Sequence, residues 1–426
     1  MVAVVVVILA LLTVLALRVG GTVLFPPALF CATWCATLGG VFVAGPRFLP
    51  ISEYSCLIYL VGAVAFVLGG VAVLYYLEGP GQVGGLRVPS TVITRRVLDG
   101  MLIFLIATYP YYFHIALRIA GTLNPVLFFA AVRSHMLQAN GNPFGLAGNL
   151  NVLAALVAGA MVYESDGTIG RRVRTTIAVV LALAYGVLTG SKGGVLMLVT
   201  LFFITQIRVG RVKPVAAMTA FAVALALFVA GLWAINFSGH RFGDVSALAD
   251  RVGGEISNYW LGSPVAFSQV ATKLDSLPST ESVGRFFLQT ERSLGVQVRI
   301  PSIVAPFTVF SVNGEDSNTY TIYFSYFKEY GLLGSIALLS ALGGFLTLVW
   351  RRAMGGAAIA ILFYASFCTA IAQSIESENF FLGLNGYIKA LLVYGFLYWV
   401  LPRYFPDQKK DVQENVLSDG RILGHS

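Results

Sequence analysis

Three short segments bring polar residues to the ends of apolar runs, where their chemistry would matter most. A polar side chain at membrane depth costs several kcal/mol unless it lines an aqueous or substrate cavity. The first segment, LTGSKGGV at 188–195, is a glycine-flanked turn that presents Lys192. Two interpretations of Lys192 stay open: a cation that contacts an anion, or a lysine of a tight helical hairpin that extends its ammonium group to the interface.

The second segment, NTYTIYFSYFKEYGLLG at 318–334, concentrates hydrogen-bonding side chains just before an apolar helix. Asn318, Tyr320 and Tyr326 lie in it, and some of its tyrosines belong to the aromatic belt of a membrane interface. Glu329 requires a further explanation, because a carboxylate at the mouth of a span needs water, Lys328 or a substrate group beside it.

The third segment, AQSIESENFF at 372–381, carries Glu376 and Glu378. Side chains two residues apart point to different sides of a helix but to one face of an extended segment. The pair could therefore act together, or the two carboxylates could be ordinary solvated charges of a loop.

The scaffold that must position these segments is indicated by composition. The chain has 426 residues, of which 57% are hydrophobic and only 11% charged, and its mean hydropathy is +0.80. A soluble domain of this size could not bury so much apolar surface. The sequence therefore predicts an all-α polytopic membrane protein with about eleven transmembrane helices. The expected spans are residues 1–17, 22–43, 54–77, 97–117, 147–163, 174–190, 193–207, 214–235, 326–349, 355–373 and 384–401. The first run lacks a basic flank and a cleavage site, so we expect a retained helix and not a signal peptide.

The net charge of +8 follows from basic residues that gather on alternate loops, which indicates a membrane orientation and no nucleic-acid partner. Cytoplasmic loops are enriched in Lys and Arg, so the pattern predicts the amino terminus outside and the carboxy terminus in the cytoplasm. The residues that this orientation places inside are Arg18, Arg87, Arg95, Arg96, Arg171, Arg172, Arg174, Arg208, Arg211, Lys213, Arg351, Arg352, Arg403, Lys409, Lys410 and Arg421. The four cysteines all fall in apolar runs, so neither a disulfide nor a metal pair is expected.

Domain organisation follows from the same orientation. Residues 1–235 would hold eight helices, with an external amphipathic segment at 118–146, and residues 320–405 would hold the last three. Between them, 236–319 form an external loop of 84 residues, which is too long for a simple connector and predicts a folded cap. The polar tail 406–426 is expected to be disordered. The chain contains no Walker loop, HExxH or GxSxG motif, which weakens nucleotide-driven transport and ordinary hydrolase chemistry.

Several of these segments together resemble the Wzy-type polysaccharide repeat-unit polymerases, relatives of the O-antigen ligases. The resemblance rests on 318–334, on NYWLGSPVAFSQ at 258–269, on FPPALFCATWC at 25–35 and on the TGSKGG turn. In that family the segment that re-enters the membrane reads Asn-x-Tyr-Thr, then an acidic residue and Gly-x-x-Gly. The matching residues here are Asn318, Tyr320, Thr321, Glu329, Gly331 and Gly334.

The resemblance implies a GT-C-like glycosyltransferase in a bacterial inner membrane, which joins oligosaccharide repeat units carried on undecaprenyl diphosphate. It implies no metal or nucleotide cofactor, membrane lipids as partners and a possible chain-length regulator. Cations would bind the diphosphate, a carboxylate or imidazole would accept the acceptor proton, and residues of the re-entry segment would bind sugar. The implied diphosphate ligands are Arg133, Lys192, Arg241, Arg285, Arg292 and Arg299; the implied bases are Glu329, then Glu376 and Glu378, then His240; and the implied sugar ligands are Asn318, Tyr320 and Tyr326.

Three alternatives stay open. An O-antigen ligase would carry a histidine just before the Asn, where this chain has Ser317, and the nearest upstream histidine is His240. A transporter of polar or lipid-linked solutes would explain the spans but not the long external loop, and it predicts inverted repeats. A membrane scaffold without catalysis predicts no cavity for an anionic lipid.

Overall fold

The part of the chain that the structure describes is mainly helical and contains one short two-stranded ribbon. The computed structural model describes residues 1–76, 92–124, 127–128, 131–132, 134–135, 143–165, 168–189, 193–209, 258–277, 281–301 and 307–405. The long helices are α1 (Val2–Gly20), α2 (Pro26–Ala44), α3 (Glu53–Tyr76), α4 (Val92–Ala120), α6 (Gly148–Glu164), α7 (Ile169–Leu188), α8 (Gly193–Val209), α13 (Ile322–Met354), α14 (Ala358–Gln373) and α15 (Leu384–Gly395), the last continuing through Phe396–Val400 into α16 (Leu401–Tyr404).

The described helices confirm a multi-pass membrane architecture. Seven of them are long and apolar enough to cross a bilayer: Val2–Gly20, Pro26–Arg47, Glu53–Tyr76, Ile93–Ala120, Gly145–Glu164, Ile322–Met354 and Leu384–Tyr404. The expected spans at 174–190, 193–207 and 355–373 overlap helices α7, α8 and α14, which do not meet that measure. The expected eighth span, 214–235, and the tail 406–426 lie outside the described residues. The total of eleven spans therefore stays a prediction.

Local sequence explains where several helices begin and end. α2 begins with two prolines, which suit the first turn because its N–H groups have no helical partner. α1 ends at Gly20 and is capped by Gly21, whose φ of 70° is the left-handed conformation that glycine adopts at low cost. α13 bends at Gly331, where φ is 64°, so residues 322–330 form a short re-entry helix that is set off from the long one.

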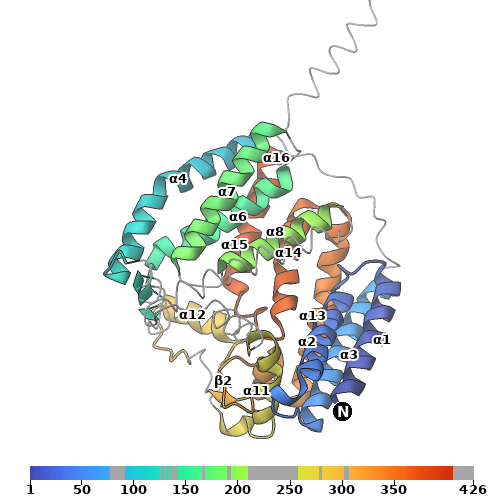
Figure 1. The fold of residues 1–426 in the computed structure, drawn as a ribbon. Coiled ribbons are helices and arrows are strands. Elements are labelled where there is room, and N and C mark those ends of the chain that lie inside the picture. Colours follow the sequence, from blue (N-terminus) through green and yellow to red (C-terminus); the bar gives the residue numbers. More distant parts are fainter. Residues whose placement is uncertain are drawn as a thin grey trace, which may run out of the picture.

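The helices form two groups, each with its own apolar core (Figure 1). In one group α1, α2 and α3 pack together and α13 runs along α3. A Cβ atom at Gly69 would collide with the Ser340 carbonyl, and one at Gly343 would collide with the Phe66 carbonyl. Glycines therefore permit the close approach of α3 and α13, as small residues do in membrane bundles. In the other group α4, α6, α7 and α8 pack with α14 and α15.

A compact segment outside the long helices covers one end of the molecule. It contains a short π-helix (Asn258–Gly262), α11 (Ser263–Val270), the 3₁₀ helix η4 (Leu274–Ser276), α12 (Arg285–Ser293) and the antiparallel strands β1 (Thr308–Val309) and β2 (Asp316–Ser317). Figure 1 shows α11, α12 and β2 at the end where the amino terminus lies, whereas α16 lies at the opposite end.

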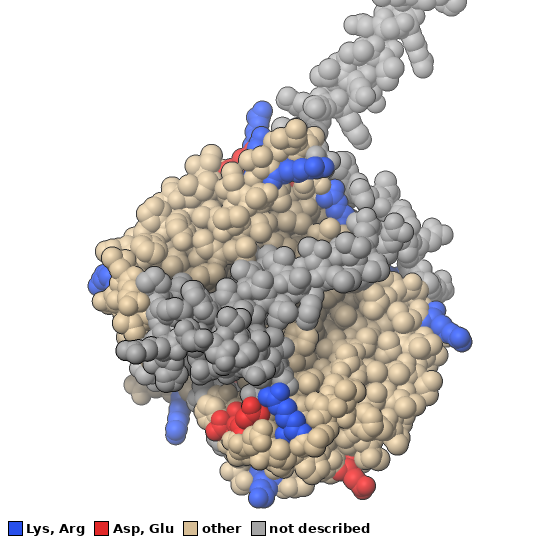
Figure 2. Space-filling view, in the orientation of Figure 1, with Lys and Arg blue, Asp and Glu red and all other residues tan. Residues whose placement is uncertain are grey.

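Specific bonds hold this segment against the helices. The Tyr59 hydroxyl donates to the Pro264 carbonyl at 2.6 Å, and Arg47 pairs with Glu315 at 3.3 Å. Charged side chains in the space-filling view lie mainly at the ends and rim of the molecule, and the flanks over the long helices are largely uncharged (Figure 2). This distribution fits helices that contact lipid.

Candidate functional site

The re-entry segment forms the first turns of α13 and is fixed to the turn between α14 and α15. The Ile322 N–H donates to the Ser374 carbonyl at 2.9 Å, and Ser374 also accepts a hydrogen bond from the Trp34 indole at 3.1 Å. Gly331, the first glycine of the family-like Gly-x-x-Gly, ends the short helix with its positive φ. A glycine is needed there because an L side chain is strained in that conformation.

Glu329 connects this helix to the segment that contains α12. Its Oε1 accepts a hydrogen bond from the Ser282 N–H at 2.6 Å, and its Oε2 lies 3.5 Å from the Val283 nitrogen. Beside it, the Ser282 and Ser325 hydroxyls are 2.9 Å apart and hydrogen-bonded. Residues 282–284 are the turn that leads into α12. Glu329 therefore fixes the start of α12 to α13.

Glu378 is the most deeply buried carboxylate of the described residues, with 2% of its surface exposed. It accepts hydrogen bonds from the N–H groups of Phe380, Phe381 and Leu382 at 2.7 to 3.2 Å and from the Tyr326 hydroxyl at 3.1 Å. Burial raises the pKa of Glu378, and these hydrogen bonds oppose that shift without cancelling it. The carboxylate therefore holds the turn at residues 380–382 together and fixes it to Tyr326 of α13.

Glu376 lies in a different environment from Glu378, although their spacing would place both on one face of an extended segment. Residues 374–376 form a turn, in which the Glu376 N–H donates to the Gln373 carbonyl at 2.9 Å. Glu376 is partly exposed there, while Glu378 points inward. The turn separates the two carboxylates because it removes the extended geometry that a common face requires.

Two of the three predicted sugar ligands are packed inside the protein. Tyr326 is fully buried and donates to Glu378. Tyr320 is 4% exposed, stacks on Phe324 with ring centroids 4.7 Å apart, and shares a 2.6 Å hydrogen bond with the Thr308 hydroxyl. Burial raises the pKa of Tyr320. Of the three, Asn318 alone keeps an appreciable exposed surface.

Three of the six predicted diphosphate ligands lie on α12 and the chain that follows it. Arg285 donates to the Pro301 carbonyl at 2.7 Å, and partial burial lowers the pKa of its guanidinium. Arg292 and Arg299 are exposed and line an open hollow of about 740 Å³ that runs along residues 295–301. Arg133, Lys192, Arg241 and the proposed base His240 lie outside the described residues.

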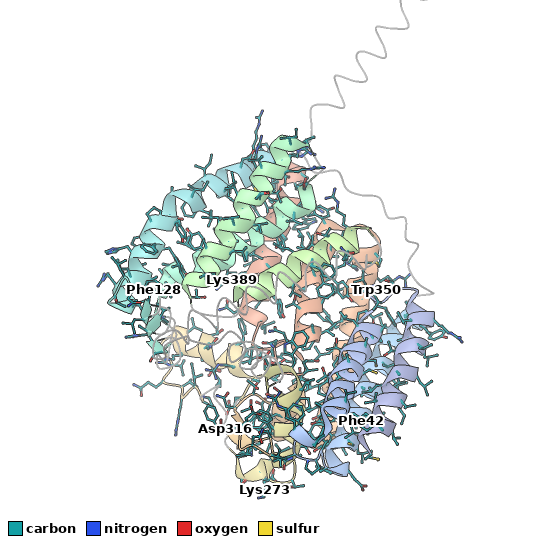
Figure 3. The ribbon with its side chains drawn as sticks, viewed as in Figure 1. Phe42, Phe128, Lys273, Asp316, Trp350 and Lys389 are labelled. Atoms are coloured by element: carbon teal, nitrogen blue, oxygen red, sulfur yellow. The ribbon has the colours of Figure 1, made fainter. Side chains whose placement is uncertain are left out.

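Lys389 is a cation that the sequence analysis did not select. It lies in the second turn of α15 (Figure 3). Its ammonium group donates to the Asn149 Oδ1 of α6 at 2.7 Å. The available signal was a single lysine within the apolar run 384–401, and ionisable residues inside a span commonly mark functional sites.

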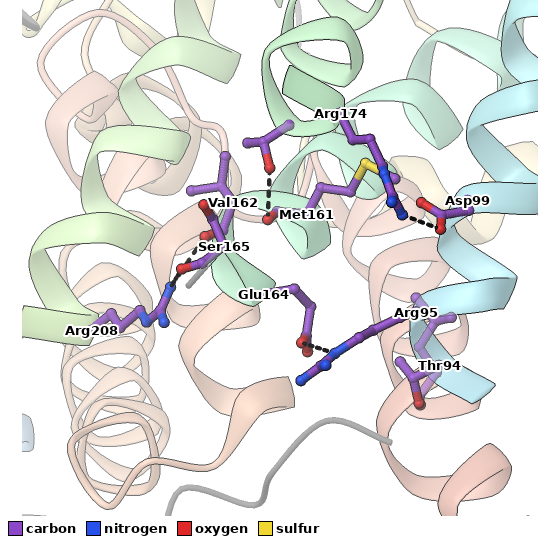
Figure 4. A network of polar contacts seen from close by, with 11 residues as sticks. Thr94, Arg95, Asp99, Met161, Val162, Glu164, Ser165, Arg174 and Arg208 are labelled. Carbon is purple, nitrogen blue, oxygen red and sulfur yellow. Dashed lines mark hydrogen bonds and ion pairs between the residues drawn. The ribbon is translucent and has the colours of Figure 1, made fainter. Parts of the chain in front are cut away.

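A separate polar network lies among α4, α6, α7 and α8 (Figure 4). Arg174 pairs with Asp99 at 2.6 Å and Arg95 with Glu164 at 3.8 Å, while Arg208 donates to the Ser165 carbonyl at 2.7 Å. The two ion pairs line a pocket of about 50 Å³, which suits a few water molecules and not a sugar. The network therefore fastens helix ends together.

The fold thus defines a multi-pass α-helical membrane protein with a folded segment over one end. No protein-family model, curated protein or solved structure matches the chain. Within the described residues, no cluster of three or more His, Cys, Asp or Glu side chains is placed to hold a metal ion.

Proposed function

We propose that this protein is a polysaccharide polymerase of the bacterial inner membrane, which joins oligosaccharide repeat units carried on undecaprenyl diphosphate. One observation carries the proposal: Glu329 of the re-entry helix bonds the turn before α12, the helix that bears Arg285 and Arg292. A carboxylate and cations thereby belong to one unit at one end of the membrane domain. Transfer of a sugar from a lipid diphosphate needs both kinds of group.

In the proposed reaction, the bond between the anomeric carbon of the growing chain and its phosphate oxygen breaks. Undecaprenyl diphosphate departs with the bonding electrons, and a hydroxyl oxygen of the incoming unit forms the new bond to the anomeric carbon. The hydroxyl proton passes to a protein base. Guanidinium groups stabilise the charge that develops on the leaving diphosphate, and Arg292 and Arg299 are exposed to it in their hollow.

Among the described carboxylates, Glu329 is the first choice for the base. Glu329 is partly exposed, which makes its carboxylate accessible to a substrate hydroxyl, and it is bonded to the turn that leads into α12. Glu376 is the second choice because it is partly exposed. Glu378 fits a positioning role, since its buried oxygens are occupied by three N–H groups and Tyr326.

The proposed orientation places the amino terminus, α12 and Glu329 outside the cytoplasm. The carrier diphosphate is expected at that surface, at the level of the lipid headgroups. A chain-length regulator is the proposed protein partner.

The proposal is tested with purified protein in proteoliposomes that contain undecaprenyl-diphosphate-linked repeat units of the native polysaccharide. We expect a ladder of polymer on gels from the wild type, and shorter or no polymer from the Arg292→Ala/Arg299→Ala double variant. Lys273→Ala is the matched control, because Lys273 is an exposed cation of the same segment that does not line the hollow. Absence of polymer from folded, membrane-inserted wild-type protein contradicts the proposal.

A further inference from the structure

Lys389 occupies an unusual place for a cation. It is the sixth residue of α15, within a stretch that qualifies as a membrane span. A helix rises 1.5 Å per residue, so its Cα lies roughly 8 Å inside the start of the helix. Helical side chains lean toward the amino-terminal end, and the long lysine side chain carries the ammonium group back toward the helix start.

The start of α15 belongs to the same end of the molecule as the re-entry helix. The turn that precedes α15 contains Ser374, whose carbonyl accepts the Ile322 N–H at the start of α13. The ammonium group of Lys389 is therefore at the level where the helices leave the hydrocarbon, close to Asn149, the second residue of α6. Phosphate groups of membrane lipids lie at that level.

The partner of Lys389 is neutral and is held in position. Asn149 accepts from Lys389 through Oδ1 at 2.7 Å, and its Nδ2 donates to the Leu146 carbonyl at 3.1 Å. The second bond fixes the orientation of the amide, so its oxygen faces the lysine.

The described cations fall into two groups: some pair with a carboxylate, and others, such as Arg208, Arg285 and Lys389, donate to a neutral oxygen. Arg47, Arg95 and Arg174 each pair with a carboxylate. No carboxylate within the described ranges forms an ion pair with Lys389, so its charge is not neutralised there. An ammonium group has three donors, and Asn149 accepts from one of them. The other two can bind an anion.

We propose that Lys389 and Asn149 form a binding site, at the contact of α6 with α15, for the phosphate group of an amphiphile whose apolar chain lies along the membrane helices. Two sources share this chemistry: an isoprenyl diphosphate and an anionic phospholipid. With the isoprenyl source, the inference extends the proposed function by adding a cation for the carrier. Asn149 orients the lysine, and Lys389 supplies the charge.

The test measures binding of farnesyl diphosphate to the detergent-solubilised chain, with farnesol as the uncharged comparison. We expect Lys389→Met to weaken diphosphate binding by roughly ten- to a hundredfold, the usual loss for a hydrogen bond to a charged group. Lys389→Arg should stay within a few-fold of the wild type. Asn149→Asp should also weaken binding, because the new carboxylate would neutralise a lysine that is still present, while thermal stability is kept.

A second arm identifies the source. Wild type and Lys389→Met are placed in nanodiscs of pure phosphatidylcholine or with added phosphatidylglycerol, and farnesyl diphosphate binding is repeated. If phosphatidylglycerol weakens farnesyl diphosphate binding to the wild type but not to Lys389→Met, the site belongs to phospholipid. If phosphatidylglycerol does not compete with farnesyl diphosphate for the wild type, the site belongs to the isoprenyl diphosphate.

Equal farnesyl diphosphate affinity in the wild type, Lys389→Met and Asn149→Asp overturns the inference, as does failure of the wild type to bind. The outcome is separable from that of the proposed function. Lys389-dependent binding without polymer formation would remove the polymerase and keep the site. Normal polymer formation with farnesyl diphosphate binding that does not depend on Lys389 would keep the polymerase and remove the site.

Discussion

The turn between α14 and α15 is predicted to depend on Glu378 more than on any neighbouring side chain. Replacing Glu378 with Ala leaves three N–H groups and the Tyr326 hydroxyl without their acceptor. Hydrogen bonds to a charged group contribute about 1.5–3 kcal/mol each, but the cost of burying the charge is recovered when it is removed. We therefore expect a net loss of about 3–5 kcal/mol for Ala and about 1–3 kcal/mol for Gln, which keeps one acceptor oxygen.

The assay is unfolding in mixed micelles followed by tryptophan fluorescence. Trp34 is a suitable reporter, since its indole donates to Ser374 of the same turn at 3.1 Å. Glu376→Gln is the matched control: the same chemical change two residues away, at a partly exposed position, should cost less than about 1 kcal/mol. Equal losses from the two Gln variants, or no loss from Glu378→Ala, would refute the assignment of Glu378 as the acceptor that holds the turn.

The pH dependence of the unfolding free energy tests the role of Glu378 in a second way. Burial raises the folded-state pKa of Glu378 above its ordinary value of 4.5, so the folded protein holds this proton more tightly than the unfolded chain. The contribution of Glu378 to the free energy of unfolding is therefore largest below pH 4.5, and it falls as pH rises through the folded-state pKa. The Glu378→Gln variant lacks that dependence, so the stability difference between the two should shrink with rising pH.

The other predictions concern the re-entry helix and the orientation. Gly331→Ala should cost about 1 kcal/mol in the same unfolding assay, because φ is 64° there, while Gly386→Ala in α15 should be nearly neutral, since a Cβ meets open space. Glu329→Gln should lower polymerisation turnover by roughly a hundredfold if it is the base; near-normal turnover with lower thermal stability would leave it only the role of holding α12. In a background without native cysteines, an impermeant maleimide should label Lys273→Cys but not Arg172→Cys in intact spheroplasts, and the reverse pattern would overturn the proposed orientation.

The membrane architecture was predictable because hydropathy acts locally along the chain. The predicted runs at 1–17, 22–43 and 54–77 became helices within a few residues of their expected bounds. The bend of α13 was less accessible, because a glycine in an apolar run is compatible with a straight helix. The hydrogen bond from the turn before α12 to Glu329, two residues before Gly331, joins segments that are far apart in the sequence, so a single sequence does not show it.

The site was predictable only in part, because side-chain contacts between distant segments do not appear in a single sequence. Glu378 is separated from Tyr326 by 52 positions, and the spacing of Glu376 and Glu378 did not indicate that one of them would be buried. Lys389 was overlooked because only residues at helix ends were considered. Its contact with Asn149 spans 240 positions.

The most direct test of the central claim is the stoichiometry of carrier release. Purified protein in proteoliposomes is given radiolabelled undecaprenyl-diphosphate-linked repeat units, and free undecaprenyl diphosphate and new glycosidic bonds are counted in the same sample. A polymerase releases one carrier for each bond formed, and this is the result we predict. Movement of intact lipid-linked units across the membrane, with neither released carrier nor new bonds, would identify a transporter and contradict the account.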